Sequence, residues 1–298
     1  MKISNIKLLK SFISSLFILS STAVLGEDTD LSKDDFDLDT VTVGEFNFEL
    51  LMGWMQLESP VLGKGDMKLN LIPRFSYYGE KFYIENTKIG YSLVEEERWN
   101  FDLIGKLNQD GVYFNENSSL NGLADVNFSL TTESQDIGRL QAAGGADIRI
   151  SPLERDFSYM AGISGSFHFS SSVSTYFSYT SDVSGVHNGY ETDLAISYRN
   201  RFDDINLMME IGVVSKSDQL TDYYYGVQDN IPGLSFYEVT GSTQNPYFSV
   251  SINKRINKNW SLVYSNRITY FDDKITESPI VLQDRVNYQF LGLSYRFD

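Results

Sequence analysis

The sequence predicts an all-β protein built as a single antiparallel transmembrane β-barrel of about twelve strands, with ten or fourteen as the alternatives. The first observation behind this prediction is a repeating pattern from Phe46 to the end of the chain. Segments of roughly ten residues alternate apolar and polar side chains and are separated by turn residues. The second is an export signal that no later apolar stretch of helix-spanning length follows.

The composition excludes some classes of function. The 298 residues carry a formal net charge of -16 and no cysteine. Phosphate backbones would be repelled by such an acidic chain, so we expect no nucleic-acid partner. The absence of cysteine fits an exported protein that needs no disulfide.

Residues 1–26 predict a secretory signal peptide. Lys2, Lys7 and Lys10 precede the apolar stretch 11–25, which ends in a plausible cleavage site at Gly26. An uncleaved anchor is the alternative. Residues 27–44 hold seven acids and one lysine and predict a disordered periplasmic leader. Residues 45–298 would then form a barrel in the bacterial outer membrane, in contact with its lipid.

Side-chain parity defines the predicted strands. In 205–213, for example, Ile205, Leu207 and Met209 share one face, and Asn206 and Glu210 the other. Twelve segments follow this pattern: 46–54, 67–77, 81–93, 99–107, 139–150, 157–169, 173–181, 190–199, 205–213, 247–254, 260–270 and 286–297. A soluble β-sandwich would share the alternation. The many charges opposite aromatic faces favour a barrel with a wet interior.

Strand direction assigns the connections to two sides. Counting from a periplasmic N-terminus, the predicted outside loops are 58–66, 94–97, 151–156, 182–188, 216–243 and 272–284. The predicted inner turns are 79–80, 170–172, 200–204 and 255–259. Residues 108–137 break the scheme, because they are long and yet fall on the periplasmic side. Three alternatives are open for them: they fold into the lumen, face the periplasm or contain a strand pair that the count has missed.

Charges on the inward parity nearly balance. They are Glu49, Asp102, Asp147, Glu191, Asp193 and Glu210 against Arg74, Lys106, Arg139, Arg149, Arg199, Arg267 and Arg296. This balance predicts cross-strand ion pairs in a narrow barrel rather than a wide pore selective for one sign of charge.

No pattern in the sequence indicates catalysis, a metal or a cofactor. Asp182, Ser184 and His187 could be imagined as a hydrolytic triad, but no nucleophile elbow or oxyanion donors accompany them. A tight glycine-containing loop is the favoured interpretation. Tyr223, Tyr224 and Tyr225 predict either a sticky contact surface or rings packed over the barrel mouth.

Several motifs in order resemble the MltA-interacting protein family, also called MipA/OmpV. The clearest are 182–190 (DVSGVHNGY), 223–227 (YYYGV), 278–281 (SPIV) and the closing 292–297 (GLSYRF). The resemblance implies an outer-membrane barrel without known catalysis. The best-described member is a scaffold that joins a periplasmic lytic transglycosylase to a murein synthase. The candidate functional residues are Asp182, Gly185, His187, Gly189, Tyr223, Tyr224, Tyr225, Gly226, Ser278 and Pro279.

Three functions follow as hypotheses. The first is a non-enzymatic adaptor for murein-remodelling enzymes that uses 108–137 or the acidic leader as its contact surface. The second is a narrow channel or uptake route for small solutes. The third, more remote, is an outer-membrane lipid hydrolase based on His187 and Ser184.

Overall fold

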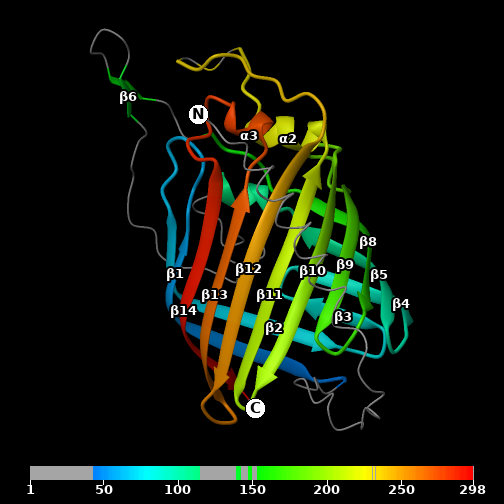
Figure 1. Ribbon diagram of the computed structural model, residues 1–298. Coiled ribbons are helices and arrows are strands. Elements are labelled where there is room, and N and C mark those ends of the chain that lie inside the picture. Colours follow the sequence, from blue (N-terminus) through cyan, green and yellow to red (C-terminus); the bar gives the residue numbers. More distant parts are fainter. Residues whose placement is uncertain are drawn as a thin grey trace, which may run out of the picture. The chain divides into compact units, whose positions relative to one another are not determined.

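The computed structural model describes residues 43–114, 153–229, 231 and 233–297, together with the backbone of 139–141 and 147–149. Twelve strands form a closed antiparallel barrel in which β1 pairs with β14 (Figure 1). They are β1 (Phe46–Leu57), β2 (Met67–Tyr78), β3 (Phe82–Glu85), β4 (Lys88–Glu95), β5 (Trp99–Leu107), β8 (Tyr159–His168), β9 (Val173–Asp182), β10 (Tyr190–Phe202), β11 (Ile205–Lys216), β12 (Thr243–Arg255), β13 (Trp260–Tyr270) and β14 (Arg285–Phe297). The predicted fold class is confirmed.

Two of the predicted strands are wrong, and their errors cancel in the count. Residues 81–93 form two strands, β3 and β4, because the chain turns at Asn86, whose φ of 53° lies in the left-handed region. Residues 139–150 are not a barrel strand: β6 (Arg139–Gln141) and β7 (Asp147–Arg149) pair with each other in a separate two-stranded sheet. Asp147, Arg139 and Arg149 therefore leave the predicted set of lumen charges.

Because of these corrections, two connections lie at the end of the barrel opposite to the one predicted for each. Residues 96–98 join β4 to β5 at the end that also carries the short turns 169–172, 203–204 and 256–259. We call this the turn end. β5 finishes and β8 begins at the other end, the loop end, so the segment 108–137 is not attached on the periplasmic side as predicted. Residues 115–138 themselves lie outside the described residues.

The outer surface of the barrel is an apolar band. At alternate positions large apolar side chains remain 38–54% exposed, among them Trp54, Leu71, Leu103, Leu194, Ile196, Leu291 and Leu293. A water-soluble protein rarely exposes so many apolar side chains together, whereas a transmembrane barrel presents them to lipid. None of the described helices is long and apolar enough to cross a bilayer.

The lumen contains both ion pairs and an apolar core. Lys106 Nζ lies 2.6 Å from Glu191 Oε1, and Arg74 pairs with Glu49 at 3.6 Å, so the predicted cross-strand pairing is present. The apolar core is formed on β1, β2, β13 and β14 by Leu51, Met55, Ile72, Val263 and Phe290, which pack together with Val112, a residue that follows β5. Side chains thus fill a large part of the barrel interior.

Candidate functional site

The loop end of the barrel is closed by a compact cap. Two helices lie there, α2 (Asp218–Tyr225) and α3 (Asp273–Thr276), at the end opposite the turn that joins β12 to β13 (Figure 1). A 3-10 turn, η2 (Asp110–Tyr113), lies beneath α2. We define the cap as residues 108–114, 153–158, 183–189, 217–227 and 271–281.

Asp182 organises the first motif, the loop between β9 and β10. Its Oδ1 accepts hydrogen bonds from the backbone N–H and the hydroxyl of Ser184, at 2.8 and 2.6 Å. Its Oδ2 accepts from the N–H groups of His187 and Asn188, at 2.7 and 2.9 Å. Gly185 adopts a φ of +75°, which a residue with a side chain rarely does. This arrangement is the tight loop favoured by the sequence.

His187 is turned inward and bonds to Ser158. The ring Nε2 lies 2.9 Å from Ser158 Oγ, and Nδ1 accepts the N–H of Gly189 at 2.9 Å. Since Nδ1 accepts, this hydrogen-bond network assigns the proton to Nε2, which donates to Ser158. The ring therefore cannot act as the general base for Ser158, as a hydrolase would require. Ser184, the nucleophile considered from the sequence, donates to Asp182 and not to His187.

Burial sets the protonation of the imidazole. Loss of hydration lowers the pKa of His187 below its usual value, because the charged form is the one that burial penalises. The carboxylates of Asp182, Asp110 and Glu191 oppose this effect, and the ammonium of Lys216 adds to it. Near neutral pH the ring is neutral, as its hydrogen bonds require.

The second motif, the run of tyrosines, lies in α2 rather than in a loop. Ser217 caps the helix by accepting the N–H of Leu220 at 3.3 Å. Tyr224 and Tyr225 are 0% exposed, and their rings pack against Phe114 at centroid distances of 5.8 and 5.9 Å. Of the two interpretations left open by the sequence, rings packed over the mouth is the correct one for these two residues.

Tyr223 lies at the edge of the same packing. Its hydroxyl accepts the backbone N–H of Asp156 at 2.9 Å, and the Arg155 guanidinium lies 5.7 Å from its ring centroid. Arg155 also donates to the carbonyl of Gly226 at 3.1 Å. The segment before β8 is thereby fastened to α2 through cation–π and hydrogen-bond contacts.

The third motif joins α2 from the segment after α3. Ser278 donates its hydroxyl proton to the carbonyl of Tyr225 at 2.5 Å, and half-buried Pro279 follows. Gly226 ends the helix against Asp222, whose carbonyl and carboxylate leave no space for a Cβ. Gly189 is packed just as closely against Ser217. The structure thus brings all ten sequence-predicted residues into or beside one cap.

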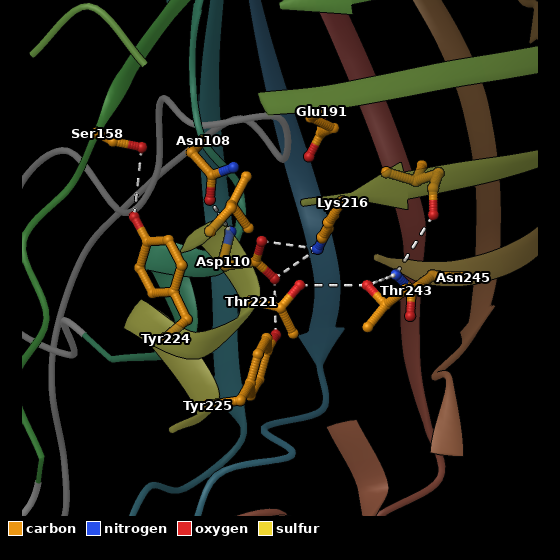
Figure 2. Close-up of polar contacts among 12 residues, drawn as sticks. Asn108, Asp110, Ser158, Glu191, Lys216, Thr221, Tyr224, Tyr225, Thr243 and Asn245 are labelled. Atoms are coloured by element: carbon orange, nitrogen blue, oxygen red, sulfur yellow. Dashed lines mark hydrogen bonds and ion pairs between the residues drawn. The ribbon is translucent and has the colours of Figure 1, made fainter. Parts of the chain in front are cut away.

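The strongest polar cluster of the cap was not predicted from the sequence. Lys216 Nζ lies 2.7 Å from both carboxylate oxygens of Asp110, and Tyr225 donates to Asp110 Oδ1 at 2.7 Å (Figure 2). The Asp110 and Lys216 side chains are 1% and 9% exposed. Asp110 lay in the segment assigned to the periplasm. Lys216, however, continues the inward parity of Glu210 in β11, and that signal was available.

The cluster links η2, β11 and α2. Burial raises the pKa of the Tyr225 phenol well above its ordinary range, and the Asp110 carboxylate adds to the shift. The phenol therefore stays protonated and donates. Beside it, Thr221 and Thr243 share a hydrogen bond of 3.2 Å, and Tyr224 lies 3.5 Å from the hydroxyl of Ser158 (Figure 2). Tyr224 also donates to the carbonyl of Asp156 at 3.0 Å. Within the described residues no group of three His, Asp or Glu side chains is arranged to hold a metal ion.

A closed antiparallel barrel with an apolar outer band and a mouth filled by its own loops is the architecture of an outer-membrane β-barrel protein. The family assignment agrees with this class. The chain belongs to the MltA-interacting protein MipA family, whose model matches residues 52–297.

Two relatives carry different kinds of name, one for an outer-membrane location and one for an interaction. The protein of Escherichia coli strain K12 named outer membrane protein YiaT is 24% identical over 243 residues, which are 80% of this chain and 87% of that protein. The MltA-interacting protein of the same strain is 29% identical over 147 residues, which are 48% of this chain and 58% of that protein. This chain is accordingly an outer-membrane protein of the MipA family.

Solved barrels show a looser likeness. The KdgM porin aligns over 85% of this chain and all (100%) of its own, with 10% identity and a TM-score of 0.37. The CymD monoaromatic hydrocarbon channel aligns over 91% of this chain and 94% of its own, with 11% identity and a TM-score of 0.33. Likeness at this level does not specify what the present lumen binds or passes.

Proposed function

We propose that this protein is a non-enzymatic adaptor of the outer membrane that contacts a periplasmic lytic transglycosylase and a murein synthase. The single observation that supports it best is the closed cap. Tyr224, Tyr225 and Phe114 are 0% exposed at the mouth of the barrel, and a mouth packed like a protein core favours a structural role over free diffusion. A relative bears the name MltA-interacting protein.

The proposed contact surface is the turn end together with the leader. In this proposal residues 1–26 are removed as a signal peptide, and 27–44 become an acidic periplasmic leader continuous with β1. β1 starts at the turn end, where the Gly44 N–H donates to the carbonyl of Tyr78 at 2.7 Å. The leader therefore joins the barrel on the side that would face the murein layer. The other surface considered from the sequence, 108–137, is no longer part of this proposal, because both ends of that connection lie at the loop end.

Site-specific photo-crosslinking in intact cells tests the adaptor proposal. A photoreactive residue is placed at exposed turn-end positions, Asp204 or Lys258, and at exposed loop-end positions, Asp229 or Glu238, as matched controls. We expect a transglycosylase or synthase adduct from the turn end alone. A second strain lacks 27–44 and keeps 1–26, and we expect it to yield less adduct at normal barrel abundance. The proposal would be refuted if neither enzyme were found in any turn-end adduct.

A narrow conduit for small solutes is the second candidate. One observation favours it, a cavity of about 270 Å³ inside the lumen. Passage would require the cap to open, because the buried rings and the Asp110–Lys216 ion pair lie at the mouth. Planar-bilayer recording distinguishes the two candidates. Discrete conductance steps of the native protein that vanish when the lumen is plugged would favour the conduit over the adaptor.

A further inference from the structure

The lumen cavity is built from one continuous wall of the barrel. Its lining comes from β12, β13, β14, β1 and β2, which are consecutive neighbours in the closed sheet. Gln109, Val112 and Tyr113, in and just before η2, complete it. No residue of the three motifs lines it, and of the cap only residues 109–113 border it.

The chemistry of the lining favours an anion. Among the described residues of the lining, Arg74 and Arg267 are the ionic side chains and none is a carboxylate. Hydroxyl groups such as those of Ser249 and Ser265 add short donors, while Leu57 and Val286 supply an apolar strip. A pocket with an apolar body and a few placed charges is the usual form of a small-molecule site.

The Tyr247 side chain contacts both acidic and basic groups of the lumen. Asp193 and Glu210 each accept a hydrogen bond from the Tyr247 hydroxyl, at 3.1 Å. The Arg267 guanidinium lies 3.8 Å from the Tyr247 ring centroid. Arg267 also interacts electrostatically with Asp193 and Glu191, so Arg74 is the arginine on which ligand binding mainly depends.

Arg74 is the more accessible of the two arginines. It lies 3.6 Å from Glu49, and its side chain remains 47% exposed. An ion pair this open contributes little to stability, so a ligand carboxylate can compete with it. Glu49 is itself satisfied by a second donor, the hydroxyl of Ser294.

We propose that this cavity binds a small organic carboxylate with a body about the size of one sugar or aromatic ring. The volume of about 270 Å³ is slightly below the usual range of ligand sites, roughly 300 Å³ upward, which limits the ligand to one ring. A guanidinium matches a carboxylate with two parallel N–H donors, and this geometry discriminates the acid from its neutral counterpart. This site is independent of the adaptor role, which does not use the lumen.

Isothermal titration of the detergent-purified outer-membrane protein tests the proposal. The probes are benzoate and glucuronate, each paired with a neutral molecule of similar shape, benzyl alcohol and glucose. We expect at least one acid to bind about tenfold or more tightly than its neutral partner, because only the acid forms charge-assisted hydrogen bonds. Equal affinity of both pairs, or no binding of either acid, would overturn it.

Variants locate the binding. The double variant Arg74→Gln/Arg267→Gln is expected to weaken acid binding about tenfold or more, and Ser251→Phe to abolish it by occupying the cavity while keeping both arginines. Arg199→Gln, a change of the same kind on β10 and outside the lining, is the control and should leave affinity unchanged. Folding of each variant is checked by its heat-dependent mobility on gels. Full affinity in folded Ser251→Phe would place the site elsewhere and refute the proposal.

Discussion

Replacing Lys216 with Met is expected to loosen the cap, because it leaves the Asp110 carboxylate buried without its cationic partner. The ammonium lies 2.7 Å from both oxygens of that carboxylate, and the two side chains are 9% and 1% exposed. Met preserves most of the length of the lysine stem, so the main loss is the charge and its hydrogen bonds. Water cannot replace them while the cap is closed.

The structure limits the size of this effect. Removing one partner of a buried ion pair costs about 3–5 kcal/mol, since the remaining charge is uncompensated. Tyr225 still donates to Asp110, so the lower end, about 3 kcal/mol, applies. Opening of the cap would then become roughly a hundredfold more frequent, at about 1.4 kcal/mol for each factor of ten. The barrel strands should be unaffected, because such openings are local.

Hydrogen exchange followed by mass spectrometry measures this opening in peptides that cover α2. The matched control is Lys88→Met, which breaks an ion pair with Glu85 at 3.7 Å whose side chains are 31% and 38% exposed. An exposed pair contributes about 0–1 kcal/mol, so exchange in α2 should not change. The double variant Lys216→Met/Asp110→Asn should recover much of the protection. Exchange in Lys216→Met within about threefold of the native rate would refute this account of the cap.

Three further changes test other contacts. Gly53→Ala should reduce the folded fraction on unheated gels, because its Cβ would collide with the backbone of β14 at the closing seam, whereas Gly65→Ala meets nothing and should fold normally. Gly189→Ala should make the loop after β9 and α2 more sensitive to protease, since a Cβ there has no space beside Ser217. Because burial lowers the pKa of His187 in the folded state, its contribution to stability is complete above about pH 6.5 and is lost as the pH falls below that value. Protease sensitivity of the cap should therefore rise on acidification in the native protein and less in His187→Gln, and an identical pH profile in both would contradict the assignment.

The fold could be predicted because alternation is a local property that the sequence displays directly. Strand pairing is not local, and this is where the prediction failed. The run 81–93 lacks a strong breaker within its turn, and only Asn86, a residue that tolerates positive φ, marked the point. Residues 139–150 alternate as well as any barrel strand. The sequence does not reveal that the two ends of this segment pair with each other instead of with a barrel strand. The long segment 108–137 on the side of short turns was the sign that strands had been wrongly assigned.

The candidate site could be predicted residue by residue but not as an assembly. The order and spacing of the motifs identified Asp182, His187, the tyrosines and Ser278. Their convergence depends on tertiary packing, such as the hydrogen bond between Ser278 and the Tyr225 carbonyl across 53 positions. Asp110 was missed for the same reason. A buried carboxylate cannot be distinguished by sequence from a solvated one until its partner, here Lys216, is placed beside it.

The adaptor and the conduit make opposite demands on this ion pair, and η2 connects them. Asp110 of η2 is held by Lys216, while Val112 and Tyr113 of the same turn line the lumen cavity. A solute that left through the loop end would have to break the pair and displace α2, whereas an adaptor requires both to remain in place. The Lys216→Met variant should therefore separate the two functions in planar-bilayer recordings. Conductance steps in the variant and none in the native protein would mean that the barrel is normally closed by this contact. Conductance steps of equal size in both proteins would show that the cap does not obstruct the path, and would remove the main support for the adaptor.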